Sequence, residues 1–251
     1  MAYKDNCLEN VIFRIDFVNG FNVNALPVQK VLLESFPIIE TEEMQGQEIS
    51  NFISEDGTPK VNIKRSTWIN HYFWDRQKTK RFAVSQNSIY IDIKKYDSYT
   101  NTKKHFTSAV EAIKASSQDA IINRIGMRYI NRIDLTNIRR SVWSKYINKK
   151  HLDAVMVCFD EMSLVSSVNS VELSYNDFTL RFNYGFLNPD KPSVQRRHIF
   201  TIDLDAFTFG EMNISEVTSY LDEFHTRIES MFEAIIGDSQ RKQMGENAHE
   251  S

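Results

Sequence analysis

The chain has 251 residues, of which 41% are hydrophobic and 25% charged, and its formal net charge is -3 at pH 7. This composition is typical of a soluble globular protein and gives no overall electrostatic attraction to nucleic acid or anionic membranes. No stretch approaches the roughly 18 consecutive apolar residues that a membrane-spanning helix requires.

The cysteines and the N-terminus bear on the compartment. Cys7 and Cys158 are the two cysteines of the chain. They lack the CxxC spacing of a zinc site and are too few for a disulfide framework, which favours a reduced setting. The segment Met1 to Asn6 has no apolar run after its charge, so we expect no signal peptide. The sequence therefore predicts a cytoplasmic protein.

The first half of the chain predicts strands with one helix near each end. Val11 to Phe17 alternates apolar and polar side chains, as a half-buried strand does. Asn19-Gly20 predicts a turn, and Asn24 predicts an N-cap. The other expected elements are a helix over Leu26–Phe36, a strand over Ile38–Ile53 with Gly46 as a candidate bulge, a turn at Glu55–Pro59, a strand over Val61–Asp75, two short strands within Arg81–Tyr96, and a helix over Thr102–Ser116.

The second half predicts a similar order. We expect a strand over Ile121–Leu135, mostly helix over Val142–Phe159, a hairpin over Ser167–Leu187 that turns at Asn176-Asp177, a strand over Gln195–Phe209, and one long helix from Ser215 to about Met244. Ser215 is a fair N-cap for that helix. The tail after Gly245 is expected to fray.

Two sequence echoes suggest an internal repeat. Val11-Ile-Phe-Arg-Ile-Asp-Phe17 is echoed by Tyr129-Ile-Asn-Arg-Ile-Asp-Leu135, and Ser88–Ile93 is echoed by Ile199–Leu204 at a similar offset. The predicted fold class is therefore α+β, a tandem duplication of a β-α-β(3-4)-α unit, with antiparallel sheets and helices packed on one face. At a coarse level this plan is TATA-binding-protein-like or helix-grip-like. The units would be residues 1–120 and 121–245, as two domains or one compact domain, with a tail over 246–251.

One predicted strand carries a row of arginines. Arg124, Arg128 and Arg132 share one face of the strand Ile121–Leu135, with a gap at Gly126, and Arg14 lies at matching phase on the first strand. Such a rack of planar donors suits phosphates or carboxylates. The preferred interpretation is structural pairing with acids of matching phase. The candidate acids are Asp16, Asp92, Asp203 and Asp205.

An aromatic, basic segment follows an acidic one. Residues 31–59 hold seven acids and no lysine or arginine, whereas residues 60–81 hold seven basic residues and one acid. Trp68 and Tyr72 lie at the same strand phase as Arg76, a pattern that suits single-stranded nucleic acid. We favour a core strand here, with Ile63, Ile69 and Phe73 packing inward.

Three stretches carry a resemblance. Leu8–Phe17, the motif Arg124-Ile-Gly-Met-Arg-Tyr-Ile-Asn-Arg-Ile-Asp134 and the helix Leu221–Ile236 resemble an uncharacterised, sporadically distributed bacterial protein family of about this length. The resemblance covers nearly the whole chain and implies no activity. Patchy distribution is typical of accessory genes, including phage-defence cargo.

No catalytic, metal or cofactor signature is found. The six histidines form no HxH or HExxH pattern, and there is no GxGxxG, GxxxxGK[ST] or GxSxG motif. A lone Asp203-Leu-Asp205 is weak evidence for Mg²⁺. Because these signatures are missing, we do not expect an enzyme. We expect a non-enzymatic protein-interaction or regulatory module with a protein partner. Nucleic-acid or phosphorylated-ligand binding through the arginines is the alternative, followed by a metal-dependent phosphate-processing enzyme; homo-oligomerisation stays open.

Overall fold

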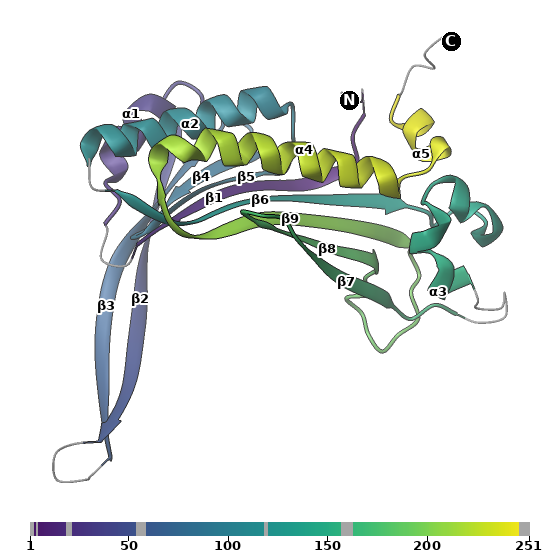
Figure 1. The fold of residues 1–251 in the computed structure, drawn as a ribbon, viewed down its shortest axis with the longest axis horizontal. Coiled ribbons are helices and arrows are strands. Elements are labelled where there is room, and N and C mark those ends of the chain that lie inside the picture. The colour runs from purple at the N-terminus through teal and green to yellow at the C-terminus, as the bar shows by residue number, and fades with distance from the viewer. Residues whose placement is uncertain are drawn as a thin grey trace.

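The strands of the protein form one sheet. A computed structural model describes residues 3, 5–18, 22–53, 59–117, 120–156 and 163–245. Within them, nine antiparallel strands run in the order β2-β3-β4-β5-β1-β6-β9-β8-β7 (Figure 1). Their bounds are β1 Leu8–Phe17, β2 Ile38–Ile53, β3 Pro59–Trp74, β4 Lys80–Val84, β5 Ser88–Ile93, β6 Ile121–Asp134, β7 Ser167–Ser174, β8 Thr179–Phe186 and β9 Ile199–Asn213.

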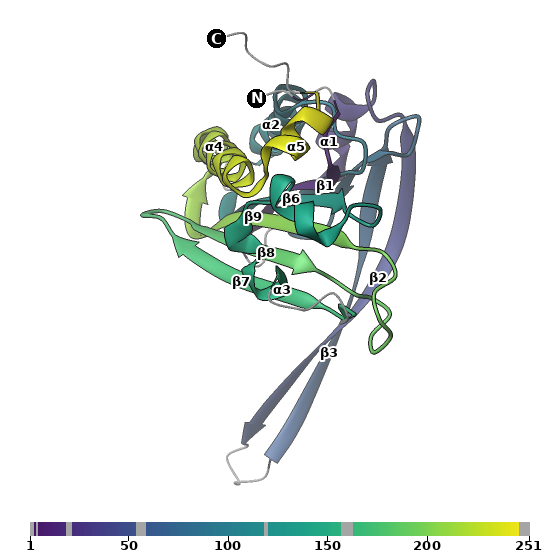
Figure 2. The same cartoon turned by 90° about the vertical axis from the view of Figure 1, so that its right-hand side faces the viewer.

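Three helices lie over one face of this sheet, namely α1 (Ala25–Leu32), α2 (Tyr99–Ser116) and α4 (Val217–Ile235) (Figures 1 and 2). The predicted cap of α1 is confirmed, because the Asn24 side chain accepts a hydrogen bond from the Leu26 amide. α3 (Asp153–Met156) lies at the end of the sheet with the short 3-10 helices Arg140–Lys145 and Lys149–His151. α5 (Asp238–Gln243) follows α4.

The core lies between the three helices and the sheet. Val11, Phe13 and Ile15 of β1 are fully buried, as the alternation of that strand predicts. The apolar stripe of α4 is also buried, including Leu221 and Phe224. Within the described ranges, α1, α2 and α4 all lie on the core side, and the polar residues of β1 and β6 point to the opposite face of the sheet.

The predicted tandem duplication is wrong, and with it the TATA-binding-protein-like or helix-grip-like plan. β1 pairs with β6 along its length, from Leu8 to Phe17, in the middle of the single nine-stranded antiparallel sheet. Two separate sheets would leave the edges of β1 and β6 exposed, whereas this pairing satisfies their backbone groups. The two echoed motifs overlap only at Val11 and Tyr129, and Arg14 of the first lies opposite Gly126, outside the second.

The second half also departs from the predicted helices. The segment predicted as mostly helix over Val142–Phe159 is divided, up to residue 156, into three short helices, Arg140–Lys145, Lys149–His151 and α3. The predicted N-cap Ser215 is wrong. Asn213 forms a capping box with Glu216 around the 3-10 helix Ile214–Glu216, which leads directly into α4. The long terminal helix is interrupted after Ile235, because the Gly237 amide donates to the Tyr146 carbonyl at 2.7 Å. A Cβ at Gly237 would lie 2.3 Å from the Lys145 carbonyl oxygen, so the chain there has no room for a side chain.

Several local predictions are confirmed. The two short strands within Arg81–Tyr96 are β4 and β5, and the hairpin over 167–187 is β7 and β8 with its turn at Asn176-Asp177. The bulge at Gly46 is wrong, since β2 and β3 pair in unbroken register from Ile38 to Ile53. Five predicted features lie wholly or largely outside the described residues: the turn at Asn19-Gly20, the turn at residues 55–59, the helix end at residues 157–159, Cys158 and the tail after Gly245.

No helix in the described part of the chain combines the length and the apolar character needed to cross a bilayer.

Candidate interaction surfaces

The face of the sheet away from the helices, which we call the open face, carries a row of alternating charges. Residues directly opposite one another on antiparallel strands point to the same face. One such row crosses eight strands from β7 to β3, and its members are Glu172, Arg181, Asp205, Arg128, Ile12, Asp92, Arg81 and Trp74. The open face is therefore a mixed-charge surface and not a purely basic one.

Each predicted arginine of this face has an acidic partner. Arg128 donates two hydrogen bonds to Asp203, at 2.7 Å from Nε and 2.8 Å from Nη2. This pairing raises the pKa of Arg128. The other three arginines pair with acids as well: Arg14 with Asp16 through Nε, Arg124 with Asp16 at 3.6 Å, and Arg132 with Glu9.

The four acids proposed as partners differ in what they bind. Asp16 and Asp203 bind arginines of β1 and β6, whereas Asp92 binds Arg81 of β4 at 3.1 Å. Asp205 lies opposite Arg128 in the ladder, but no salt bridge to it is found among the described residues. Burial raises the pKa of Asp205, and the charges of Arg124 and Arg128 partly offset this effect. Among the described acids of the row, Asp205 lacks a salt bridge, whereas Glu172 and Asp92 each have one.

The structure brings three of the arginines together around one shallow cavity. The cavity measures about 380 Å³ and is lined by Arg14, Arg124, Arg128, Asp16 and Asp205 with neighbouring apolar atoms. The predicted gap at Gly126 is filled, because the Arg124 guanidinium lies over that residue, 2.8 Å from where a Cβ would stand. The charges of Asp16 and Asp205 offset those of the arginines, and the Arg124 side chain fills part of the space. The cavity is therefore a poor site for a phosphate.

A hairpin projects from the edge of the sheet. β3 pairs with β4 only from His71 to Trp74. Beyond that point β3 pairs with β2 alone, within the part of the chain that the structure describes. We call residues 43–53 and 59–69 the arm. The arm extends away from the sheet on the side opposite to the helices, as both ribbon views show (Figures 1 and 2).

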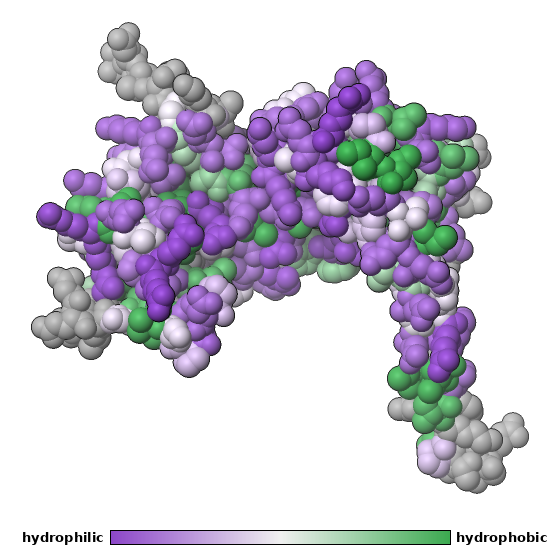
Figure 3. Space-filling model, turned by 180° about the vertical axis from the view of Figure 1, so that it is seen from behind, coloured by the Kyte–Doolittle hydropathy of each residue, from purple (hydrophilic) through white to green (hydrophobic). Residues whose placement is uncertain are grey.

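The arm exposes aliphatic side chains on one face near its far end. Ile49 lies opposite Ile63, and both point the same way as Ile53 and Val61. Their exposed fractions are 62% and 52% for the first pair, and 76% and 63% for the second. We call these four residues the arm patch, and it appears as a hydrophobic area on the projection in Figure 3.

The prediction of a core strand over Val61–Asp75 is wrong in part. Phe73 is buried, but Ile63 and Ile69 are 52% and 54% exposed. A strand in the sheet and a strand in a projecting hairpin share the same alternation of side chains, so the pattern could not separate the two. Only the end of β3 that reaches the sheet packs on the core.

The aromatic residues of β3 have their rings and hydrogen-bonding groups engaged within the protein. The Tyr72 hydroxyl donates to Glu42 at 2.8 Å, and Trp74 donates to Glu40 at 2.8 Å. The guanidinium of Arg81 lies over both rings, 5.2 Å from each centroid. Acids of β2 therefore lie beside these rings, and their charge disfavours phosphate groups there.

The two remaining predicted site residues lie apart from each other. Trp68, on the arm, donates to Asn70 at 3.2 Å, just beyond the base of the arm. The six-membered ring of Trp68 lies over Gly46, 2.8 Å from where a Cβ would stand there. Arg76 is exposed in the turn between β3 and β4, beyond the end of the strand. Tyr72 shares the open face with the four arginines, because it lies two residues before Trp74 on β3, whereas Trp68 lies on the arm and Arg76 in a turn.

The described chain shows no group of three His, Cys, Asp or Glu side chains placed to hold a metal ion. Asp203, half of the Asp203-Leu-Asp205 pattern, is 9% exposed and is occupied by Arg128. The arrangement offers no assembled metal centre at this place.

Sequence reasoning missed the arm patch. Its signal was the contrast with the next strand: β2 and β3 have 16 residues each, whereas β4 has five, so most of the hairpin extends past its neighbour in the sheet. No comparison with protein-family models or with curated proteins finds a match for this chain. The resemblance to the sporadic bacterial family stays a prediction.

Proposed function

We propose that this protein is a non-enzymatic protein-interaction module that binds a partner protein between its arm and its open face. The observation that carries the proposal is the arm patch, four aliphatic side chains exposed by more than half on a two-stranded projection. A hairpin of two strands is marginally stable alone in water, and contiguous exposed apolar residues mark interaction sites.

The partner that fits is a protein with an apolar patch and a mixed-charge surface around it. On the arm, β2 contributes the exposed acid Glu43, and β3 contributes exposed bases such as Lys64 and Arg65. The open face alternates acids and arginines in the same way. Complementary charges of both signs give specificity for one protein surface, while the aliphatic residues supply most of the burial.

Two features favour a protein over the alternatives. The arginines of the open face are paired with carboxylates, so few positive charges remain for phosphate groups. On the arm the acids of β2 lie beside the bases of β3, so the charge there is mixed and gives little net attraction to a nucleic acid or an anionic membrane. A regulatory or accessory role in a multi-gene bacterial system of the phage-defence kind is the setting that we propose, on the resemblance alone.

The test compares the wild-type protein with two double variants in pull-downs from its host at low salt, with and without nuclease. Ile49→Lys/Ile63→Lys changes the arm patch. Leu26→Lys/Leu33→Lys makes the same change at equally exposed aliphatic residues near α1, which are 55% and 50% exposed. We expect a stoichiometric partner that survives nuclease, is lost with the arm variant and is kept by the α1 variant.

Binding of the purified partner must then be measured directly. The proposal is supported if the partner has the same affinity for the wild type and the α1 variant, and an affinity at least about tenfold lower for the arm variant. If the partner is lost on nuclease treatment, the protein binds nucleic acid instead, and the proposal is wrong. Self-association of the purified protein that the arm variant abolishes would make the occupant a second copy. Equal capture by both variants would contradict the role of the arm.

A further inference from the structure

The sheet ends at β7, at the far side from the arm (Figure 2). β7 pairs with β8 in unbroken register over its whole length. Along the outer edge of β7, no strand is found among the residues that the structure describes. An edge of this kind presents backbone donors and acceptors that can pair with a strand of another chain.

The backbone groups of β7 that point outward follow from the turn after the strand. The Tyr175 amide donates to the Phe178 carbonyl at 2.8 Å, so these two residues form a hydrogen-bonded pair. Bonded and non-bonded pairs alternate along an antiparallel ladder. Val171 is therefore bonded to β8, whereas its neighbours Ser170 and Glu172 direct their amides and carbonyls away from the sheet.

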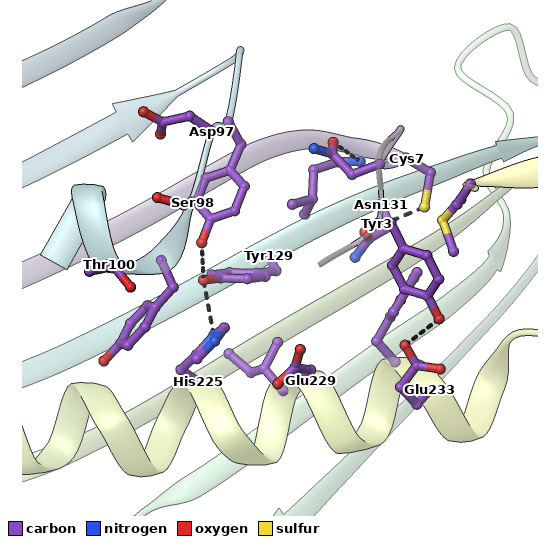
Figure 4. Close-up of a pocket in the computed structure, with 17 residues that line it drawn as sticks. Tyr3, Cys7, Asp97, Ser98, Thr100, Tyr129, Asn131, His225, Glu229 and Glu233 are labelled. Carbon is purple, nitrogen blue, oxygen red and sulfur yellow. Dashed lines mark hydrogen bonds between the residues drawn. The ribbon is translucent and has the colours of Figure 1, made fainter. Parts of the chain in front are cut away.

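The helices cover the middle of the sheet but not this edge. One row of directly opposite residues on the helix side consists of Tyr129 of β6, Leu204 of β9, Phe182 of β8 and Val171 of β7. Tyr129 lies under α4 beside a cavity of about 370 Å³, with its hydroxyl 3.3 Å from Nδ1 of His225 (Figure 4). The exposed fractions along the row are 7%, 0%, 4% and 40%, so burial ends at β7.

Exposed aliphatic side chains gather around the same edge. Val168 of β7 is exposed on the side of the open face. The Asn188 side chain donates to the carbonyls of Val165 and Ser193, and so holds the loops before β7 and after β8 together. Three further exposed aliphatic residues lie in these loops, namely Val165, Leu187 and Val194. The edge therefore has apolar surface on both of its sides.

β7 lacks the features by which sheet edges usually avoid self-pairing. It contains no proline, lysine or glycine and no bulge. Its one charged residue, Glu172, pairs with Arg181 of the same chain at 2.7 Å. The other edge strand, β2, carries Glu40, Glu42 and Glu43 close together, and two copies of that edge would bring these like charges to one another. Self-pairing is therefore compatible with β7 and disfavoured at β2.

From these observations we propose that two copies of this chain pair β7 with β7, antiparallel, about a twofold axis at Val171. Val171 then lies opposite Val171 of the second copy, and Glu172 lies opposite Ser170, so no like charges meet. A twofold axis at Glu172 would place two carboxylates opposite one another, and an axis at Ser170 would place Val168 opposite Glu172. The pairing joins the two sheets into one. The arms lie at the outer ends of the joined sheet, so this dimer does not rest on the proposed function.

Sedimentation velocity of the purified full chain over a range of about 1–300 µM measures the dimer. The wild type is expected to dimerise with a dissociation constant on the order of 1–100 µM, because one edge strand of each copy makes a small interface. Val171→Lys and Val171→Glu each place like charges opposite one another at the axis, and should raise the dissociation constant at least about tenfold. An equimolar mixture of the two variants places opposite charges there and should dimerise again.

Both variants should keep the circular dichroism of the wild type, because Val171 is already partly in water. A wild type that stays monomeric throughout the concentration range overturns the proposal. A mixture of the two folded variants that stays as dissociated as either variant alone overturns it as well.

Two control variants exclude other surfaces. Ile39→Lys makes the same change on the edge strand β2, at a residue that is also 40% exposed. This variant and Ile49→Lys/Ile63→Lys should dimerise as the wild type does. A dimer that is lost with either control lies elsewhere and contradicts the β7 pairing. Because the arm variant tests the proposed function and the Val171 variants test the dimer, the failure of one leaves the other standing.

Discussion

Ile49 of β2 lies directly opposite Ile63 of β3 on the arm, and the two residues are 62% and 52% exposed. A cross-strand pair of this kind is worth about 0.2–1 kcal/mol, far less than burial of the same side chains in a core. The pair therefore contributes little to the stability of the isolated chain. Its apolar surface is available for burial against another protein, which is the basis of the proposed function.

The arm patch should be replaceable without loss of the fold. Ile49→Lys/Ile63→Lys should change the free energy of unfolding by less than about 1 kcal/mol, because both side chains are already largely in water. Phe73→Ala, at the other end of β3, should cost about 3–5 kcal/mol because Phe73 is buried in the core. Urea unfolding followed by circular dichroism measures both. A large loss from the arm variant would mean that the arm packs on its own sheet.

The arginines of the open face should differ in their structural importance. Arg128→Ala leaves the nearly buried Asp203 without its bidentate partner, and should cost about 2–3 kcal/mol. Arg132→Ala removes a pair whose side chains are 44% and 47% exposed, and should cost less than about 1 kcal/mol. The same urea titrations, read at one salt concentration, compare the two. Equal costs would contradict the pairing described for Arg128.

The hydroxyl of Tyr129 should stabilise the protein through both of its partners. Tyr129→Phe removes a hydroxyl that lies 3.0 Å from that of Tyr96 and 3.3 Å from His225, and should cost about 1–2 kcal/mol. Combined with Tyr96→Phe, the double-mutant cycle should give a coupling of about 1 kcal/mol, since each variant removes the same bond. Additive losses would mean that the two hydroxyls do not interact.

Asp97 should contribute to stability only above acid pH. Burial raises its pKa, but hydrogen bonds from Lys80 and Asn101 outweigh this and bring the pKa from 3.8 down to about 2. The folded protein therefore binds this proton less tightly than the unfolded chain. The contribution is complete above the unfolded pKa and disappears as the pH falls from about 4 to about 2.

The matching experiment compares Asp97→Asn with wild type at about pH 7 and about pH 2. After discounting for solvent screening, the difference should be about 1 kcal/mol at the higher pH and close to zero at the lower pH. Asp190→Asn, in an exposed loop before β9, is the control and should differ from wild type at neither pH. A difference for Asp97 that is independent of pH would contradict an origin in the charge of its carboxylate.

Local patterns predicted much of the secondary structure. Alternation identified the buried face of β1 and the arginine face of β6, because period-two burial is a property of each strand alone. Asn24 predicted the start of α1 for the same local reason. The acids that pair with Arg14 and Arg128 were also among those proposed by phase, since phase decides which face a side chain shares.

What the sequence did not predict depends on contacts between distant segments. The pairing of β1 with β6 has no local signature, so the echoed motifs were interpreted as two units instead of one sheet. The interruption at Gly237 arises from its approach to Lys145, more than 90 residues earlier in the chain. The cavity beside His225 is assembled from segments before β1, after β5, within β6 and within α4, and no spacing connects them.

The measurement that tests the central claim most directly is in-cell photo-crosslinking from a single position on the arm. A photoreactive amino acid replaces Ile63 of the arm patch in one strain and Leu33 near α1 in another, two aliphatic residues that are 52% and 50% exposed. The account predicts one discrete protein adduct from position 63 that is absent from position 33. No adduct from position 63, or the same products from both positions, would contradict it.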